Sequence, residues 1–260
     1  MIIETLSTFP EMFDAVMSAS IMKRAQEKGY LDFCAYNLRR WTHDKHRTTD
    51  DDPYGGGSGL VMKCEPIFEA YDALIGKSDS AKDDEFVPPK FADSSIKPHV
   101  VFLAPFGKKF DDKCALELSK QERLLFVCGH YEGIDERAFA LADEIVSIGD
   151  YVLTSGELAA MVVIDAVVRK IPGVLGADDG ALLESFADGL LEYPQYTRPA
   201  SYRGMDIPEV LVCGDHAKVD EWRRFQQLKR TLAMRPDLLE SAHLSDADLR
   251  YLVSLGKEEQ

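Results

Sequence analysis

The chain has 260 residues, of which 45% are hydrophobic and 29% are charged. This is the composition of a globular protein, and it excludes a chain that is largely disordered. Because 45 acidic residues outnumber 30 lysines and arginines, the formal net charge is −15, and any binding of nucleic acid must depend on locally clustered basic residues.

Four short apolar runs predict buried strands, at residues 2–6, 100–103, 124–128 and 144–148. Continuous apolar runs of this kind are typical of parallel strands that helices cover on both faces. The first run is followed by Thr8-Phe9-Pro10-Glu11, a capping-box pattern with proline near the start of a helix. Strands that alternate with helical patterns predict an α/β fold.

A strongly apolar helix is predicted over residues 158–170. Thr154 and Glu157 form a second capping-box pattern at its start. Because the helix is apolar on nearly every side, we expect it to be buried within the domain or at a subunit interface. Asp165 and Arg169 are four residues apart and therefore share one face of this helix.

The remaining segments predict how the chain is divided. Residues 77–98 are rich in serine, aspartate, lysine and proline, which is typical of a surface insertion. Helical patterns at 215–233 and 245–255 predict a small, mostly helical C-terminal domain. We therefore expect a ligand-binding domain at 1–175, a linker at 176–189 and the C-terminal domain at 190–260.

A glycine-rich segment extends from Asp50 to Gly59 and has four glycines in its last five residues. It is not a Walker A loop, because Lys63 lacks the glycine before it and the Ser or Thr after it. A dinucleotide fingerprint is also excluded, because Met62 occupies the third glycine position. Two interpretations remain open: a flexible surface loop, or a backbone that closely approaches a flat or anionic group.

Three loops directly follow predicted strands, at residues 103–107, 129–137 and 148–156. In parallel sheets, ligands bind beyond the carboxyl ends of the strands, so these loops predict a pocket. Tyr131 offers a stacking face there, and Glu132 suits a cationic or hydroxyl-bearing ligand. The alternative is an ordinary helix start with acidic residues in its first turn.

Other catalytic patterns are weak. His43 and His46 have a metal-ligand spacing but no third ligand nearby, so we assign them to the surface. No serine-hydrolase elbow is present. The basic residues at 39–47 and 223–235 are either solvated surface or phosphate-binding groups.

Six motifs occur in an order that is similar to one known family. They are Asp44-Lys45-His46-Arg47, Asp51-x-Pro53-Tyr54-Gly55-Gly56-Gly57-x-Gly59, Cys128-Gly129-His130-Tyr131-Glu132-Gly133, Ser147-Ile148-Gly149-Asp150-Tyr151-Val152-Leu153, Ile171-Pro172-Gly173-Val174-Leu175-Gly176 and Tyr193-Pro194-Gln195-Tyr196-Thr197-Arg198-Pro199. Together they resemble the bacterial tRNA (guanine-N1)-methyltransferases, the TrmD family of the SPOUT superfamily, from the N-terminus to about Leu239.

The resemblance implies a SPOUT-type parallel sheet whose chain forms a deep trefoil knot. It also implies a homodimer that binds S-adenosylmethionine in the knot. The reaction it implies is methylation of N1 of the guanosine immediately 3′ to the anticodon, at tRNA position 37.

The family's methyl-donor pocket corresponds to the three loops after the strands. Carried over position by position, it comprises Phe102, Leu103, Ala104, Pro105, Gly129, Tyr131, Glu132, Gly133, Ile148, Gly149, Asp150, Tyr151, Val152, Leu153 and Gly156. Ser155 stands where many members have glycine, and its side chain would crowd the donor if this position required a positive φ.

The resemblance also assigns the catalytic groups. Arg169 corresponds to the family's arginine that stabilises charge developing on the guanine O6. Glu184 stands where the family has an aspartate general base, with Asp178 and Asp179 as alternatives. The residues expected to bind tRNA are Lys45, Arg47, Tyr54, Gly55, Gly56, Gly57, Arg198, Arg203, Arg223 and Arg230. No metal site is predicted: Mg²⁺ could assist, but no ligand set for it is visible.

Two other functions stay open: a non-catalytic RNA-binding knot protein, and a nucleotide enzyme that uses the glycine-rich segment. Arg169 and the intact Gly129–Gly133 loop favour the methyltransferase, and the missing phosphate-binding lysine motif counts against the nucleotide enzyme. The five cysteines form no C-x-x-C pair, and no apolar stretch approaches the ~20 residues that span a bilayer. We expect a soluble cytoplasmic protein with reduced thiols, no membrane association and no stable protein partner other than a second copy.

Overall fold

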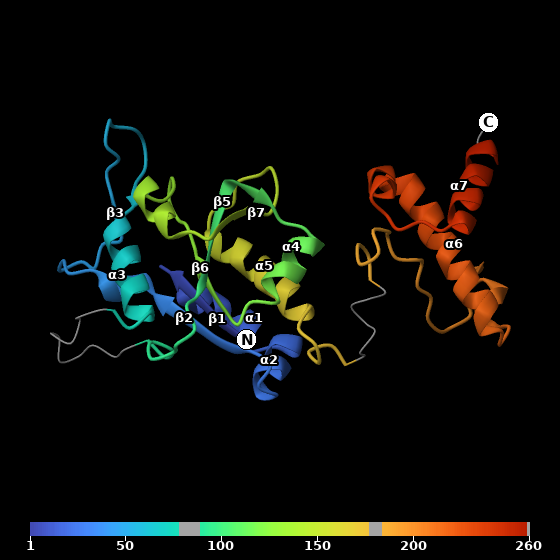
Figure 1. The fold of residues 1–260 in the computed structure, drawn as a ribbon, viewed down its shortest axis with the longest axis horizontal. Coiled ribbons are helices and arrows are strands. Elements are labelled where there is room, and N and C mark those ends of the chain that lie inside the picture. Colours follow the sequence, from blue (N-terminus) through green and yellow to red (C-terminus); the bar gives the residue numbers. More distant parts are fainter. Residues whose placement is uncertain (78–88, 177–183, 259–260) are drawn as a thin grey trace. The chain divides into compact units, whose positions relative to one another are not determined.

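The structure is a computed structural model and describes residues 1–77, 89–176 and 184–258. The chain forms two compact units, Met1–Gly176 and Ala177–Gln260 (Figure 1). The segment at 78–88, which belongs to the predicted surface insertion, and residues 177–183 of the predicted linker lie outside the described residues.

The N-terminal unit contains a five-stranded sheet in the order β2-β1-β6-β5-β7. All its neighbouring strands are parallel, which confirms the predicted α/β class. The strands are β1 (Ile2–Ser7), β2 (Asp32–Asn37), β5 (His99–Lys109), β6 (Arg123–Val127) and β7 (Glu144–Ser147). The prediction missed β2: this strand lies at the edge of the sheet and is only partly buried, so its sequence is not a continuous apolar run.

Helices and two small hairpins complete the two units. In the N-terminal unit they are α1 (Asp14–Met17), α2 (Ser20–Glu27), the hairpin β3 (Asp50–Asp51) and β4 (Val61–Met62), α3 (Cys64–Leu74), α4 (Asp112–Leu118) and α5 (Gly156–Arg169). The C-terminal unit contains the hairpin β8 (Ser201–Tyr202) and β9 (Met205–Asp206), then α6 (His216–Met234) and α7 (Asp246–Glu258).

The core of the N-terminal unit lies on both faces of the sheet. Successive residues of a strand point to opposite faces, so Val101 packs with α5 on one side while Val100 packs with α3 on the other. Figure 1 shows the sheet between these two helices. Burial on both faces is the physical reason why the central strands are mostly apolar; the exceptions include Glu4 on β1 and Arg123 on β6, which are both buried.

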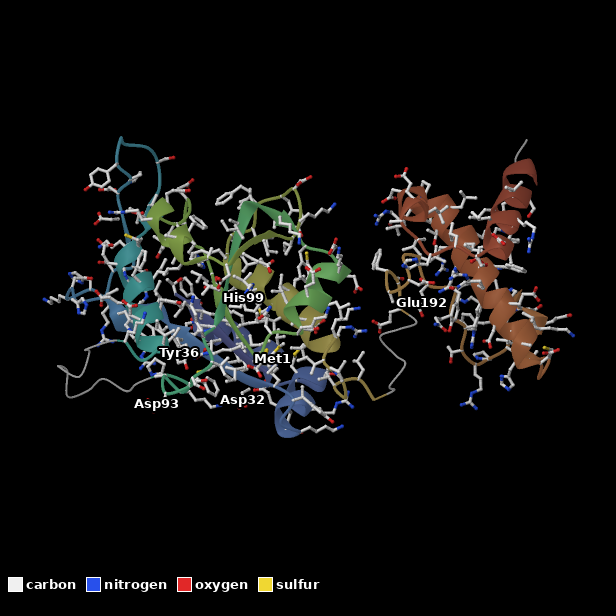
Figure 2. The ribbon with its side chains drawn as sticks, in the orientation of Figure 1. Met1, Asp32, Tyr36, Asp93, His99 and Glu192 are labelled. Atoms are coloured by element: carbon white, nitrogen blue, oxygen red, sulfur yellow. The ribbon has the colours of Figure 1, made fainter. Side chains whose placement is uncertain are left out.

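One buried ion pair connects the first strand to the centre of the sheet. Arg123 Nε on β6 donates to Glu4 Oε2 on β1 at 2.7 Å, and both side chains are fully buried. Tyr36, labelled in Figure 2, donates to the other carboxylate oxygen at 3.1 Å. Burial raises the pKa of Glu4, while the hydrogen bond from Arg123 acts in the opposite direction.

Both predicted capping boxes are wrong. Helix α5 has Ser155 at its N-cap without a side-chain cap, because the Glu157 carboxylate turns inward and accepts hydrogen bonds from Ser7 and Ser155. The first pattern leads into a short 3-10 turn whose N-cap, Phe9, also makes no side-chain cap. The Thr8 hydroxyl is buried without a hydrogen-bond partner among the described residues. In both places tertiary contacts override the local pattern.

Candidate functional site

A cavity of about 450 Å³ lies at the carboxyl ends of β6 and β7 and beside the register shift of β5. Its wall is formed mainly by residues 129–134 and 148–156, which follow β6 and β7, and by residues 103–106, which lie within β5. The predicted loop at 103–107 is therefore wrong, because β5 continues to Lys109 through a register shift between Leu103 and Lys108. The three segments are far apart in the sequence and meet because β5 lies between β6 and β7 in the parallel sheet.

Most residues carried over for the donor pocket line this cavity. They are Leu103, Ala104, Pro105, Gly129, Tyr131, Glu132, Gly133, Ile148, Gly149, Tyr151, Val152, Leu153 and Gly156. Phe102 instead lies fully buried in the core cluster that contains α3, and Asp150 is exposed outside the cavity wall.

Sequence reasoning missed several wall residues. His130 and Ile134 belong to the predicted loops and could have been found by taking each loop as a whole. Phe139 and Ala159 come from the elements after the loops, and no sequence signal marks them. Phe139 packs edge-on against Phe106 with ring centroids 5.2 Å apart, which places two aromatic rings beside the cavity.

Gly156 permits the close contact that closes the cavity wall. Its backbone N–H donates to the Gly129 carbonyl at 2.8 Å, and a Cβ added at Gly156 would lie 2.6 Å from the Gly129 nitrogen. The preceding Ser155 has φ −158°, which is extended backbone, so serine fits here without strain. Its hydroxyl bonds to Glu157 at 2.8 Å.

A buried polar cluster lies behind the cavity wall, centred on Glu157. Its carboxylate is fully buried, accepts from Ser7 at 2.5 Å, and lies 3.3 Å from His130 Nε2. These contacts tie the end of β1 and the 129–133 loop to the first turn of α5. Burial, together with the charge of Glu157, raises the pKa of Cys128 well above its usual range, so this thiol is not a nucleophile at neutral pH.

The residues that directly follow the glycine-rich segment are hydrogen-bonded to the same cavity loop. The Glu132 N–H donates to the Leu60 carbonyl at 3.1 Å, and the Met62 N–H donates to the Gly133 carbonyl at 2.9 Å. Gly59 has φ +82°, and a Cβ there would clash with the side chain of Glu132. The end of this segment therefore supports one wall of the cavity.

The expected tRNA-binding residues of the N-terminal unit lie on its surface. Lys45 and Arg47 are exposed in a turn that Asp44 organises by accepting from the N–H groups of His46 and Thr48. The hydrogen bond from the Thr48 hydroxyl lowers the pKa of Asp44. Tyr54 is fully exposed, and Gly55, Gly56 and Gly57 beside it all have positive φ.

The expected tRNA-binding residues of the C-terminal unit differ in their contacts. Arg198 and Arg203 are exposed. Arg223 lies over the ring of Tyr193 at 5.0 Å. Arg230 donates to the backbone carbonyl of Glu192 at 2.9 Å, so part of its hydrogen-bonding capacity serves the fold of this unit.

The two expected catalytic residues belong to different units. Arg169 is partly buried in the last turn of α5, and Asp165, on the same helix, is exposed. Glu184 is partly buried at the start of the described part of the C-terminal unit, where its carbonyl accepts from the N–H of Ala187 at 3.3 Å. The alternative bases Asp178 and Asp179 lie outside the described residues.

Within residues 1–77, 89–176 and 184–258, no group of three or more His, Cys, Asp and Glu side chains could hold a metal ion. His43 pairs with Glu69 at 2.7 Å. None of the helices in the described part of the chain is long and apolar enough to cross a membrane.

Comparison with known proteins gives consistent matches. A sequence profile described as "tRNA (Guanine-1)-methyltransferase TrmD" matches residues 1–241. The chain is 47% identical to a tRNA (guanine-N(1)-)-methyltransferase of Geobacter sp. (strain M21), over 99% of this chain and 97% of the relative. The proteins of the same name from Limosilactobacillus fermentum and Caldanaerobacter subterraneus subsp. tengcongensis are each 50% identical to it, over 94% and 99% of this chain and 91% and 100% of the relatives.

Proposed function

We propose, from the premise that the chain belongs to the TrmD family of tRNA (guanine-N1)-methyltransferases, that the cavity beside β5, β6 and β7 binds S-adenosylmethionine. The enzyme of this family transfers a methyl group to N1 of a guanine in tRNA. The observation that carries the proposal is the convergence on one cavity of two family motifs, Cys128–Gly133 and Ser147–Leu153, and of residues 103–105, which the resemblance also assigns to the donor pocket.

The cavity fits this methyl donor in size and chemistry. Its volume of about 450 Å³ is in the usual range for small-molecule sites. Backbone N–H and C=O groups of the loops can pair with adenine edges, and Ile148 and Leu153 supply apolar wall. Glu132 and Glu136 place acidic groups at the wall, where they suit the positive sulfonium.

We extend the proposal to the trefoil knot of this family. Supporting it, the chain passes from β7 through residues 148–155 and returns to the end of β6, where Gly156 bonds to Gly129. Protein chains almost never thread through their own loops. The proposal of a knot in this chain therefore depends on its family membership.

Two side chains carry the chemistry in this proposal. When bound, S-adenosylmethionine supplies an electrophilic methyl group. The Glu184 carboxylate accepts the N1 proton of guanine, which leaves an electron pair on N1 to form the new N–C bond as the donor's S–C bond breaks. The planar guanidinium of Arg169 stabilises the negative charge that develops on O6.

We also propose that the enzyme is a homodimer. The outward side of α5 and the preceding loop expose apolar side chains: Val152 is 84% exposed, Tyr151 56%, Val162 53% and Leu158 40%. Leu158 and Val162 are four residues apart and share one face of α5, and exposed apolar side chains that lie together are typical of subunit interfaces. A second copy of the chain would cover it.

For recognition of tRNA, we propose contacts through the exposed basic and glycine-rich residues of both units. Phosphate contacts by Lys45, Arg47 and Arg203 would position the RNA without reading its sequence. The modified base is the guanosine immediately 3′ to the anticodon, and the cellular location is the cytoplasm.

The decisive experiment incubates the protein with methyl-labelled S-adenosylmethionine and tRNA, then locates the label by nuclease digestion and chromatography. We expect 1-methylguanosine at the position 3′ to the anticodon, and no label when that guanosine is replaced by adenosine. A non-catalytic RNA-binding protein would bind the tRNA and transfer no label. Label at any other atom would contradict the proposed reaction.

A further inference from the structure

A second cavity, of about 180 Å³, lies entirely within the C-terminal unit. We refer to it as the aromatic cavity. The residues that define it are Tyr193, Tyr196, Leu211, Val219, Trp222 and Arg223, which come from the segment before α6 and from the first turns of that helix.

Flat aromatic faces dominate this cavity. The rings of Tyr196 and Trp222 are tilted by 49° with centroids 6.4 Å apart. The Arg223 guanidinium lies 5.0 Å from the centroid of the Tyr193 ring. Tyr196 is 49% exposed, so these surfaces are accessible to a ligand. The arrangement suits a planar group that stacks.

Arg223 adds an unused hydrogen-bond donor. Its Nε is buried and has no hydrogen-bond partner among the described residues, while its Nη1 reaches Asp220 at 3.3 Å. A buried donor without an acceptor is costly, so a ligand with an acceptor atom would be favoured here. The positive charge of Arg223 disfavours the cationic ligands that aromatic cages otherwise bind.

The surroundings are basic and aromatic. Arg198, two residues after Tyr196 in the chain, is exposed. On the β8–β9 hairpin, which follows in the sequence, the Arg203 guanidinium lies 5.3 Å from the ring centroid of Tyr202. Glu192, labelled in Figure 2, has its side chain paired with the amide of Gln195. Arginines interleaved with aromatic rings are typical of surfaces that bind unstacked bases of single-stranded nucleic acid.

We propose that the aromatic cavity binds one unstacked nucleobase from the anticodon loop of the tRNA substrate. The base stacks on Trp222 and accepts a hydrogen bond from Arg223 Nε. This inference rests on the proposed function, which supplies the RNA, and adds a base-binding subsite separate from the donor cavity.

The test uses the fluorescence of Trp222. The chain has two tryptophans, and Trp41 is only 3% exposed, so a Trp41→Phe variant isolates the emission of Trp222. Titration with an anticodon stem-loop RNA should quench this emission in a saturable way. A duplex of the same stem without the loop should not quench it. If Trp41→Phe fails to fold, the difference between the wild-type chain and Trp222→Phe gives the same readout.

A second measurement uses steady-state kinetics. Removal of one stacking partner by Trp222→Ala should raise the KM for tRNA roughly 5- to 100-fold. Affinity for S-adenosylmethionine should not change, because the donor cavity belongs to the other unit. Val212→Ala, at a side chain that is 68% exposed and outside the aromatic cavity, is the control and should leave the KM unchanged.

Changes in the RNA test most directly whether a single base occupies the aromatic cavity. Abasic substitution at successive loop nucleotides should abolish quenching at one position and leave it intact at the others. Normal methyl transfer without quenching would overturn the inference while the proposed function stands. Quenching that depends on protein concentration without RNA would overturn it too, because a second copy would then occupy the cavity. Absence of methyl transfer to any tRNA by the wild-type chain would instead refute the proposed function.

Discussion

At the scale of single residues, two glycines of the glycine-rich segment allow the effect of backbone strain to be measured separately from the effect of side-chain crowding. Gly56 has φ +78° and Gly59 has φ +82°. A Cβ at Gly56 would meet nothing within 4 Å, whereas one at Gly59 would clash with Glu132. Alanine at either position is strained by about 1 kcal/mol, but only Gly59→Ala must also displace Glu132 from the wall of the donor cavity.

We therefore expect Gly59→Ala to weaken binding of S-adenosylmethionine roughly tenfold, as loss of one charge-assisted contact would. Gly56→Ala should leave this affinity unchanged. Calorimetric titration of both variants with the donor measures the difference. Equal losses in the two variants would mean that strain alone, and not the position of Glu132, sets the affinity.

Glu184 gives the second prediction at this scale. Glu184→Gln keeps the shape of the side chain but removes the carboxylate, so turnover should fall about 10²- to 10⁴-fold. Donor affinity should be retained, because Glu184 belongs to the C-terminal unit and the donor cavity lies in the N-terminal unit. Single-turnover methyl transfer and donor titration provide the two readings. Full activity would shift the role of base to Asp178 or Asp179.

At the scale of elements, one arginine holds the C-terminal helices together. Arg224 on α6 donates through Nη2 to Asp248 on α7 at 2.9 Å, and through Nη1 to Asp188 at 2.6 Å. The Ser245 N–H also donates to Asp248 at 2.9 Å. The hydrogen bonds from Arg224, with those from Ser245, lower the pKa of Asp248 to about 2.

This pKa predicts acid sensitivity of the C-terminal unit. A carboxyl whose folded-state pKa is depressed stabilises the fold above its ordinary pKa, and the stabilisation is lost as pH falls from about 4 to about 2. Asp248→Asn should therefore cost about 2 kcal/mol of unfolding free energy at pH 7. Urea unfolding in the Trp41→Phe background, followed by Trp222 fluorescence at pH 7 and in acid, measures both effects. Asp246→Asn, at an exposed residue in the same first turn, should change neither.

At the scale of the whole molecule, the proposed catalytic residues lie on separate units of the chain. If a homodimer forms its active site from Arg169 of one copy and Glu184 of the other, two inactive variants can complement each other. Mixing Arg169→Ala with Glu184→Gln should restore the activity of one site per heterodimer, about half that of a wild-type dimer, because one of its two sites is intact. Each variant alone is the control. Fully active monomers at assay concentration would exclude the shared site.

The acidic chain makes a further prediction about binding. With a net charge of −15, affinity for tRNA must come from local basic surface and should fall steeply with salt. Arg203→Gln should reduce the slope of log affinity against log salt by roughly one unit. Lys23→Gln, at a lysine paired with Glu27 at 3.7 Å on α2, should leave the slope unchanged. Affinity that is insensitive to salt would show that phosphate contacts are not the basis of binding.

By itself, the sequence determined the parallel sheet, the loops that follow β6 and β7, and the family, whereas the predicted loop at 103–107 belongs to β5. A central strand can be recognised from a run of apolar residues such as Leu124–Cys128, because burial on both faces of the sheet favours apolar side chains. The ligand-binding edge follows, because loops after parallel strands must meet. The edge strand β2 lacked this signal, since it is only partly buried.

Only the tertiary structure decided what the side chains around the donor cavity do. Glu157 matched a helix cap by spacing, yet it is buried against Ser7 and lies beside His130, residues that are distant in the sequence. In the sequence nothing distinguishes Gly59 from the neighbouring glycines, whereas in the fold it lies against the side chain of Glu132. Phe102 lies in the strand that enters the cavity wall, but it is fully buried behind the wall, where its ring packs against that of Phe139 with centroids 4.9 Å apart. Spacing along a chain specifies backbone periodicity, whereas hydrogen-bond partners and close approaches depend on elements that only folding brings together.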